Sequence, residues 1–187
     1  RDHQELIACL EQRIELMMMS PACPVPVSNL YNSPETLGND RIAAAVAAAN
    51  LYSGCDVLSI DAGTCITYDF INASAEYLGG GIAPGLGLRF KALHTFTSKL
   101  PLVSLDEHVG LIGDTTAHSI QSGVYQGVMA EVDGIIDRYK MNYPGLKTIL
   151  TGGDANYFDK KLKNDIFAVP NLVLLGLKDI LQYNVEK

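Results

Sequence analysis

The sequence predicts an α/β protein in which helices pack on a mixed β-sheet. Three consecutive segments with the composition of strands lie between residues 57 and 83, and we expect the first two to be antiparallel. From residue 86 onward, helical and strand-like segments alternate up to residue 183, as in a sheet whose later strands are joined through helices. Of the 187 residues, 48% are hydrophobic, so the chain can build a sizeable core.

The first 55 residues predict a helix, a short extended segment and a second helix. Apolar residues recur at helical spacing over residues 2–19, and Pro21 and Pro24 end this helix. Residues 25–27 have a proline between two valines, which is typical of an edge strand. An alanine-rich helix is expected over residues 42–52. This order of helix, strand and helix resembles the second half of the unit that residues 56–187 predict, without the hairpin that opens that unit.

Residues 56–187 predict a complete unit. Strands are expected at 57–60, 65–71, 77–83, 147–151 and 166–169, with a further short strand near Val103. Helices are expected at 86–100, 117–142, 156–163 and 172–183.

Composition disfavours several classes of partner. The formal net charge is −7 and no run of Lys or Arg exceeds two residues, so neither nucleic acid nor an anionic membrane is expected as the main partner. The four cysteines form no CxxC pair and are expected to be reduced thiols of a cytosolic protein. The four histidines show no metal-ligand spacing. No apolar run is long enough to span a membrane, and no signal peptide is recognisable.

The turn between the first two strands of the complete unit can bind phosphate. Residues 61–64 read Asp-Ala-Gly-Thr. Glycine lets the backbone approach an anion, the Thr64 hydroxyl can donate to it, and Asp61 can hold a cation or water beside it. The alternative is a plain β-hairpin in which Asp61 and Thr64 only satisfy the turn backbone.

A loop over residues 33–41 is the second informative segment. Asp40 and Arg41 stand where this loop enters a helix. Arg41 can bind a carboxylate with two parallel hydrogen bonds, and Asp40 can accept a proton from a hydroxyl. The alternative is that Asn39 or Asp40 is the helix N-cap and Arg41 a solvated residue of the first turn.

Residues 79–85 read Gly-Gly-Gly-Ile-Ala-Pro-Gly, which is too rich in glycine for an ordinary strand end. Either the backbone passes close to another group there, or the segment is a tight crossover from strand to helix.

Taken together, these segments resemble the type III pantothenate kinases. The matching segments are Tyr31 with residues 33–41 (SPETLGNDR), residues 61–64 (DAGT), residues 79–85 (GGGIAPG) and residues 151–153 (TGG). They follow the order and approximate spacing of that family from Tyr31 to the C-terminus, and several separated motifs in order are far more specific than one. The resemblance implies the ribonuclease H-like fold of the acetate and sugar kinase, Hsp70 and actin superfamily. Residues 1–55 would then be the C-terminal part of the first actin-like lobe, and residues 56–187 the second lobe.

The activity that the resemblance implies is transfer of the ATP γ-phosphate to the hydroxyl of pantothenate, giving 4'-phosphopantothenate in the first step of coenzyme A synthesis. At the matching positions, Asp40 would be the general base. Gly38, Asn39 and Arg41 would form the pantothenate loop, and Tyr31 would line the same pocket.

The same resemblance implies the cofactors and the assembly. Thr64, Gly152 and Gly153 would lie against ATP, which brings Mg²⁺. Asp61 would be the ligand of a monovalent cation, K⁺ or NH₄⁺. Thr116 would reach pantothenate across a homodimer interface, and the enzyme would be cytoplasmic.

One departure concerns the N-terminal part. Members of the family begin with a strand and a phosphate loop of the Asp-x-Gly-Asn-Thr type, and nothing in residues 1–30 matches it. We therefore expect the chain to lack half of the phosphate cradle, and we expect activity of the parent protein rather than of this chain alone. The alternatives are a sugar or acetate kinase of the same superfamily, and a non-catalytic regulator or interaction domain derived from the kinase fold.

Overall fold

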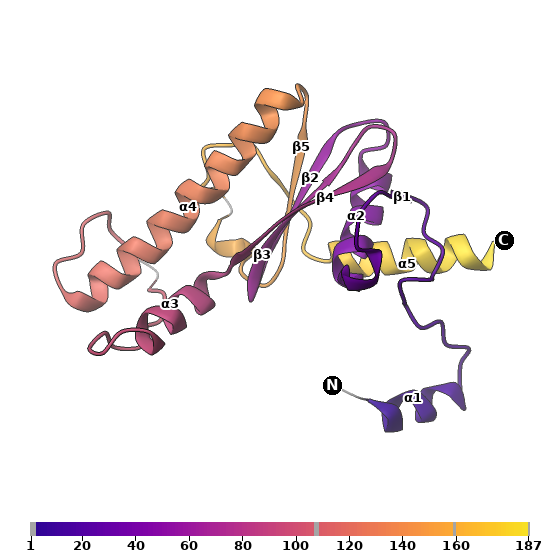
Figure 1. Cartoon of the computed structure of the whole chain (residues 1–187), viewed down its shortest axis with the longest axis horizontal. Coiled ribbons are helices and arrows are strands. Elements are labelled where there is room, and N and C mark those ends of the chain that lie inside the picture. The colour runs from indigo at the N-terminus through magenta and orange to yellow at the C-terminus, as the bar shows by residue number, and fades with distance from the viewer. Residues whose placement is uncertain (1–2, 107–108, 159, 187) are drawn as a thin grey trace.

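A six-stranded mixed sheet forms the centre of the protein in the computed structural model, which describes residues 3–106, 109–158 and 160–186 (Figure 1). The strand order is β1-β4-β3-β2-β5-β6. The strands are β1 (Ser28–Asn29), β2 (Val57–Ala62), β3 (Cys65–Ile71), β4 (Glu76–Pro84), β5 (Lys147–Thr151) and β6 (Phe167–Ala168).

The predicted fold class is confirmed by the connectivity of this sheet. Strands β2, β3 and β4 form an antiparallel meander, and β5 and β6 continue the sheet in parallel beyond β2. The resulting order β4-β3-β2-β5-β6 is that of a ribonuclease H-like lobe. β1 adds a parallel strand at the outer edge of β4. β2 has neighbours on both sides, and all its residues except Asp61 are buried, as a central strand requires.

Helices cover both faces of the sheet (Figure 1). α2 (Asn39–Leu51) and α5 (Leu172–Val185) pack on one face, where Val57, Ile71 and Ile149 point. α3 (Leu86–Thr95) and α4 (Thr116–Asn142) pack on the other, where Leu58 and Ile60 point. Neighbouring residues of β2 therefore contribute to two different hydrophobic cores, which follows from the two-residue period of a strand.

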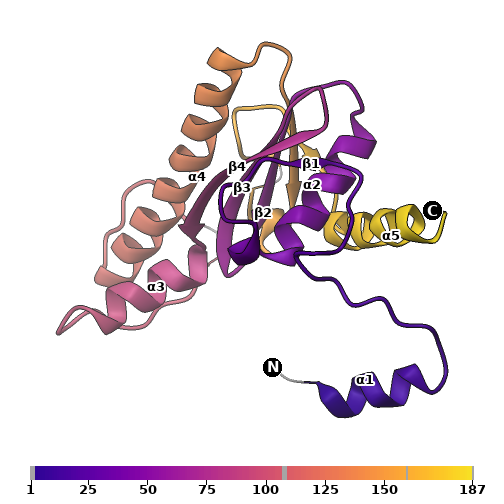
Figure 2. The ribbon, with the colours of Figure 1, turned by 45° about the vertical axis from the view of Figure 1, so that its right-hand side comes forward.

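The first helix is shorter than expected. α1 spans Gln4–Glu11, has no buried residue and lies apart from the sheet (Figure 2), while residues 12–20 are not helical. Residue 2, where the predicted helix begins, lies outside the described residues. Leu6 is 56% exposed and Ile14 is 54% exposed, so the apolar residues that predicted the longer helix have no surface to pack on. A short helix without such packing is marginal in water, which explains the difference.

Other boundaries also differ from the prediction. The edge strand lies at Ser28–Asn29 rather than at 25–27, and the described residues near Val103 form no strand. α3 ends at Thr95, after which Thr97 Oγ1 donates to the Leu93 carbonyl at 2.7 Å. The expected helix over 156–163 is a single 3₁₀ turn, Ala155–Tyr157, and its residue 159 lies outside the described residues.

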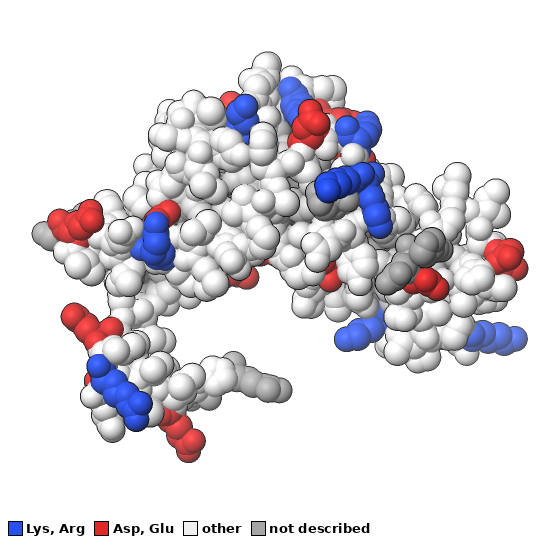
Figure 3. Space-filling model, turned by 180° about the vertical axis from the view of Figure 1, so that it is seen from behind, with Lys and Arg blue, Asp and Glu red and all other residues white. Residues whose placement is uncertain are grey.

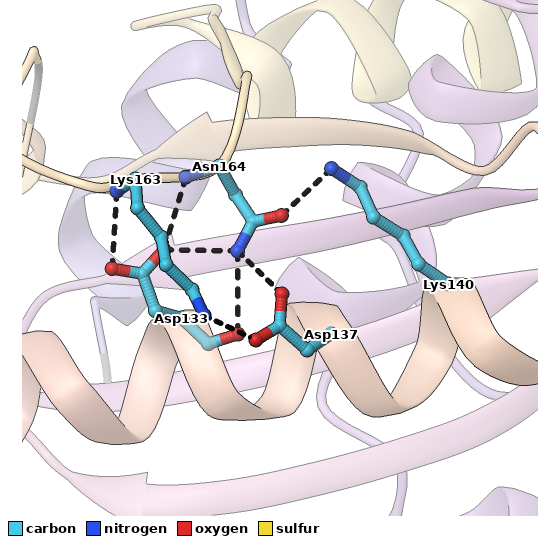
Figure 4. A network of polar contacts seen from close by, with 5 residues as sticks. All are labelled: Asp133, Asp137, Lys140, Lys163 and Asn164. Carbon is cyan, nitrogen blue, oxygen red and sulfur yellow. Dashed lines mark hydrogen bonds and ion pairs between the residues drawn. The ribbon is translucent and has the colours of Figure 1, made fainter.

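A polar network attaches the segment before β6 to α4 (Figure 4). Asn164 donates through Nδ2 to Asp133 Oδ1 and to Asp137 Oδ1, each at 3.0 Å. Its carbonyl oxygen accepts from Lys140 Nζ at 2.7 Å, and the Lys163 ammonium lies 2.5 Å from Asp137 Oδ2. The Asn164 side chain therefore forms hydrogen bonds with three residues of one helix, and these bonds stabilise the position of the chain that enters β6.

Candidate functional site

β2 and β3 are joined by a tight turn at Gly63 and Thr64. Ala62 pairs with Ile66 across the two strands, and the Gly63 N–H donates to the Cys65 carbonyl at 2.9 Å. The two predicted antiparallel strands are confirmed, but the turn is shorter than residues 61–64, because Asp61 and Ala62 are paired residues of β2. Among the hydrogen bonds of the described residues, none joins the side chain of Asp61 or Thr64 to the turn backbone, so both side chains can serve another role.

A cavity of about 290 Å³ opens beside this hairpin, and we call it the Asp40 cavity. Its lining comes from the start of α2 and from the β2–β3 hairpin: Asp40, Arg41, Ala44, Asp61, Gly63, Thr64, Cys65 and Thr67. Four residues that the sequence predicts as functional thus surround one space. The fold achieves this because α2 packs on the sheet with its first turn over the end of β2.

The start of α2 places Asp40 at the cavity without using it as a cap. Gly38 is the N-cap residue and provides no side-chain bond, so the expected N-cap at Asn39 or Asp40 is wrong. The Asn39 amide instead donates to the Met19 carbonyl at 3.1 Å. Asp40 is exposed, and its Oδ1 accepts only from the backbone N–H of Arg41, at 2.9 Å. The carboxylate therefore keeps lone pairs free to accept a proton.

Arg41 is buried rather than solvated. Its Nε donates to Asp69 Oδ1 at 2.9 Å, and its Nη2 lies 2.6 Å from the same oxygen. Asp69 also accepts from the hydroxyl of Tyr77 at 2.7 Å and from that of Thr67 at 3.0 Å. Sequence reasoning missed Asp69, although a carboxylate in the middle of the apolar segment CITYDFI was a usable signal, because a buried charge needs a partner.

Tyr31 covers the outer side of this ion pair. The Arg41 guanidinium carbon lies 5.7 Å from the centre of the Tyr31 ring, and the Tyr77 ring centre is 6.1 Å from that of Tyr31. Gly79, at φ +102°, makes room for the ring, since an added Cβ would approach Tyr31 Cδ2 to 2.9 Å. The glycine-rich segment lies within β4, and the expected close approach of its backbone to another group is confirmed at Tyr31.

Asp61 lies at the boundary between two cavities. The second, of about 480 Å³, is lined by Asp61, Thr151, Gly152, Gly153, Asn156 and Asn171 among others. Partial burial of Asp61, together with the charges of Asp40 and Asp69, raises the pKa of its carboxyl group above the ordinary value. A bound cation would offset this cost of holding the carboxylate charged. Among the described residues, no group of three or more His, Cys, Asp or Glu side chains is arranged to hold a metal ion.

Thr116 is not part of either cavity. It begins α4 and lines a third cavity of about 630 Å³, together with Arg89, Leu93, Ser119 and Gly123 among others. The structure thus brings Asp40, Arg41, Asp61 and Thr64 together and places Gly152 and Gly153 in the adjoining cavity. Within one chain it leaves Thr116 apart from them.

Two further observations bear on the class of partner. On the face in Figure 3, Lys and Arg side chains are interspersed with Asp and Glu rather than gathered in one basic surface. Across the part of the chain that the structure describes, none of the helices has both the length and the apolar character needed to traverse a bilayer.

Comparison with known proteins indicates one family. The sequence profile of the family described as type III pantothenate kinase matches residues 2–138. A type III pantothenate kinase of Phocaeicola vulgatus is 53% identical over 169 residues, which are 90% of this chain and 70% of that protein. One from Cytophaga hutchinsonii is 45% identical over 183 residues, covering 98% of this chain and 78% of the relative. One from Bacteroides fragilis is 49% identical over 91% of this chain and 70% of its own length.

A solved structure supports the fold. The crystal structure of a conserved putative Baf family transcriptional activator from Campylobacter jejuni superposes with a TM-score of 0.62, over 99% of this chain and 81% of that one. Its sequence identity is 24%, so the likeness concerns the fold alone. The curated relatives are named as kinases, and the alternative of a non-catalytic regulator is therefore not favoured. The chain belongs to the type III pantothenate kinase family, whose members are named as kinases that phosphorylate pantothenate.

Proposed function

We propose that this chain binds pantothenate in the Asp40 cavity and that the phosphoryl group reaches it from the side of Gly152. The observation that supports this most directly is the meeting of Asp40, Arg41, Asp61 and Thr64 around one space. Phosphoryl transfer depends mainly on positioning and on neutralising charge, and this set of side chains provides both a proton acceptor and a cationic group.

Asp40 is the general base in this proposal. It is exposed at the cavity and has one backbone partner, so it can accept the proton of the pantothenate hydroxyl as that oxygen attacks the γ-phosphate. Arg41 binds the carboxylate of pantothenate. Gly38 and Asn39 form the adjoining loop, and Tyr31 holds the Arg41 guanidinium from its other side.

ATP is placed with its phosphates between Thr64 and the segment of Gly152 and Gly153. The Thr64 hydroxyl is exposed and donates to a phosphate oxygen, while Gly152 gives the backbone room at the second cavity. Mg²⁺ arrives bound to ATP and neutralises phosphate charge. Asp61 binds the monovalent cation, K⁺ or NH₄⁺, which would neutralise a carboxylate whose pKa is raised by burial and by the charges of Asp40 and Asp69.

The assembly is a homodimer formed through α4. Small exposed residues follow one side of this helix at helical spacing: Thr116, Ser119, Gly123, Gly127 and Ala130. A Cβ added at Gly123 or Gly127 would meet nothing within 4 Å, so a second helix can approach closely there. In such a dimer Thr116 reaches the pantothenate of the partner.

We also propose a lobe boundary between residues 55 and 56, and a cytoplasmic location.

The test is formation of product by the purified protein, at the full length of its curated relatives, with ATP, Mg²⁺, K⁺ and pantothenate, followed by mass spectrometry. We expect 4'-phosphopantothenate and ADP in equal amounts, and less product when Na⁺ replaces K⁺. Phosphorylation of a sugar or of acetate in place of pantothenate would contradict the proposal. Calorimetric titration with pantothenate measures binding separately, and absence of binding would contradict the assignment of the Asp40 cavity.

A further inference from the structure

Asp69 lies at the centre of the buried charge cluster behind the Asp40 cavity. Its side chain is 1% exposed in the middle of β3, where it pairs in register with Ser59 of β2 and Gly80 of β4. Burial alone raises the pKa of this carboxyl, whereas Arg41, Tyr77 and Thr67 oppose that shift. A carboxylate held this deeply is not in contact with solvent, so its effect on any ligand is exerted through Arg41.

The contacts of Asp69 divide between its two oxygens. Oδ1 receives the Nε–H of Arg41 and the hydroxyl of Tyr77, and it also lies against Arg41 Nη2. Oδ2 receives the hydroxyl of Thr67. These partners come from α2, β4 and β3, so the carboxylate joins three elements at one point and has little freedom to move.

Arg41 keeps donors that this ion pair does not use. Nη2 is buried and has no aligned hydrogen-bond acceptor, although it lies 2.6 Å from Asp69 Oδ1. A guanidinium carries five N–H groups in a planar fork, and the Nε–H is the one that donates to Asp69. The remaining N–H groups belong to a side chain that lines the Asp40 cavity. A carboxylate suits the guanidinium donors that Asp69 does not hold, because a hydrogen bond between two charged groups is stronger than one between neutral groups.

We propose that Asp69 is a positioning residue that orients the Arg41 guanidinium and so determines the selectivity of the cavity for a substrate bearing a carboxylate. This inference rests on the proposed role of Arg41. Asp69 holds Nε and Nη2 of the fork, the Tyr31 ring limits its tilt, and the Nη1 group that Asp69 does not hold is presented to the carboxylate of pantothenate. A purely structural ion pair would affect stability but would not distinguish charged from neutral substrates.

The experiment compares pantothenate with its primary amide, in which a neutral group replaces the carboxylate, as substrates of the full chain. For Asp69→Asn we expect the KM for pantothenate to rise on the order of 10-fold, because the fork is no longer fixed by a charge. The KM for the amide, the KM for ATP and kcat should stay near the values of the unaltered chain. Equal increases in KM for both substrates, or no increase for either, would overturn the proposal.

Two variants keep the test decisive if Asp69→Asn does not fold. Tyr77→Phe removes one hydrogen bond to Oδ1 and keeps the ion pair, so a smaller rise in KM for pantothenate alone is expected. Thr148→Val is the control, because its hydroxyl is buried in β5 without a hydrogen-bond partner and it lies outside the cavity lining. It should change neither KM, and a Tyr77→Phe result equal to that of this control would contradict the inference.

Arg41→Ala separates this inference from the proposed function. If Arg41→Ala raises the KM for pantothenate while Asp69→Asn and Tyr77→Phe leave it unchanged, the role of Asp69 is refuted and that of Arg41 remains. If Arg41→Ala itself has no effect on this KM, the proposed role of Arg41 fails and the role of Asp69 fails with it.

Discussion

Asp61 and Gly152 lie against each other at the ends of two adjacent parallel strands. Asp61 pairs with Thr151 in the register of β2 and β5, and a Cβ at Gly152 would collide with Asp61 Oδ1 and with the Ala62 carbonyl. Gly152 also has φ +98°, a conformation that other residues adopt only with strain. The contact keeps the cavity of Asp40 and that of Gly152 adjacent, as transfer of a group between two ligands requires.

Gly152→Ala tests this contact. The added methyl group must displace backbone or the Asp61 carboxylate, and the positive φ alone adds about 1–3 kcal/mol of strain. We expect a lower Tm and a higher KM for ATP. Gly153→Ala is the matched control, because a Cβ there meets nothing within 4 Å and φ is not positive. Equal losses of Tm in the two variants would refute the role given to Gly152.

Asp61→Asn should separate stability from activity. The folded-state pKa of Asp61 is raised, first by burial and then by Asp40 and Asp69, so its ionised form opposes folding at neutral pH. We expect Asp61→Asn to raise the Tm at pH 7 and to lower activity. For a domain of this size, each 1 kcal/mol of stability corresponds to about 2–4 °C in Tm.

The raised pKa of Asp61 also determines how the Tm difference between the two proteins changes with pH. A carboxyl group with a raised pKa contributes stability below its unfolded-state pKa, and this contribution is lost as the pH rises through the folded-state pKa. The Tm difference between Asp61→Asn and the unaltered chain should therefore shrink as the pH is lowered toward 4. Added K⁺ should raise the Tm of the unaltered chain more than that of Asp61→Asn. A K⁺ effect of the same size in both proteins would argue against Asp61 as the cation ligand.

Gly123→Arg should disrupt the proposed dimer. The new side chain would stand on the exposed row of small residues on α4, where a second helix must approach closely. Sedimentation at tens of micromolar, an order-of-magnitude concentration, should show a dimer for the unaltered chain and a monomer for this variant. His118→Arg is the control, since this exposed side chain lies beside Asp114 on another side of α4. A monomeric unaltered chain would refute the assembly.

Asn164→Ala should destabilise the fold without affecting the site. Asn164 exchanges hydrogen bonds with Asp133, Asp137 and Lys140 of α4, and its replacement removes these bonds between partly buried groups (Figure 4). We expect a loss of about 1–3 kcal/mol in the free energy of unfolding, measured by urea titration, with KM values unchanged. Lys163→Ala should change stability little, because its ammonium is exposed. Equal losses in the two variants would contradict this account.

Local signals in the sequence were sufficient for the central sheet. β2 and β3 are apolar segments separated by a glycine turn, and β5 is an apolar segment that ends at two glycines, so their existence did not depend on distant contacts. The length of α1 did depend on such contacts. Its apolar spacing predicted residues 2–19, but without a packing surface only Gln4–Glu11 are helical.

The candidate site was predictable to the extent that its residues stand in recognisable segments. The structure brings Asp40 and Arg41 together with Asp61 and Thr64 around one cavity, although they stand in separate segments. The burial of Arg41 was not predictable, because it requires α2 to lie across β3 at Asp69. Neither the segment around Arg41 nor the segment around Asp69 shows this contact on its own, and a charged residue at a helix start is usually solvated.

The central claim is that Asp40 and Arg41 have different tasks in one cavity, and steady-state kinetics of Asp40→Asn beside Arg41→Ala tests it most directly. Asp40→Asn keeps the shape and removes the proton acceptor, so kcat should fall about 10²–10⁴-fold with little change in the KM for pantothenate. Arg41→Ala should instead raise that KM roughly 10–100-fold, and Arg41→Lys should restore binding only in part, because an ammonium lacks the planar fork. An Asp40→Asn enzyme with full kcat, or an Arg41→Ala enzyme with an unchanged KM for pantothenate, would contradict the account.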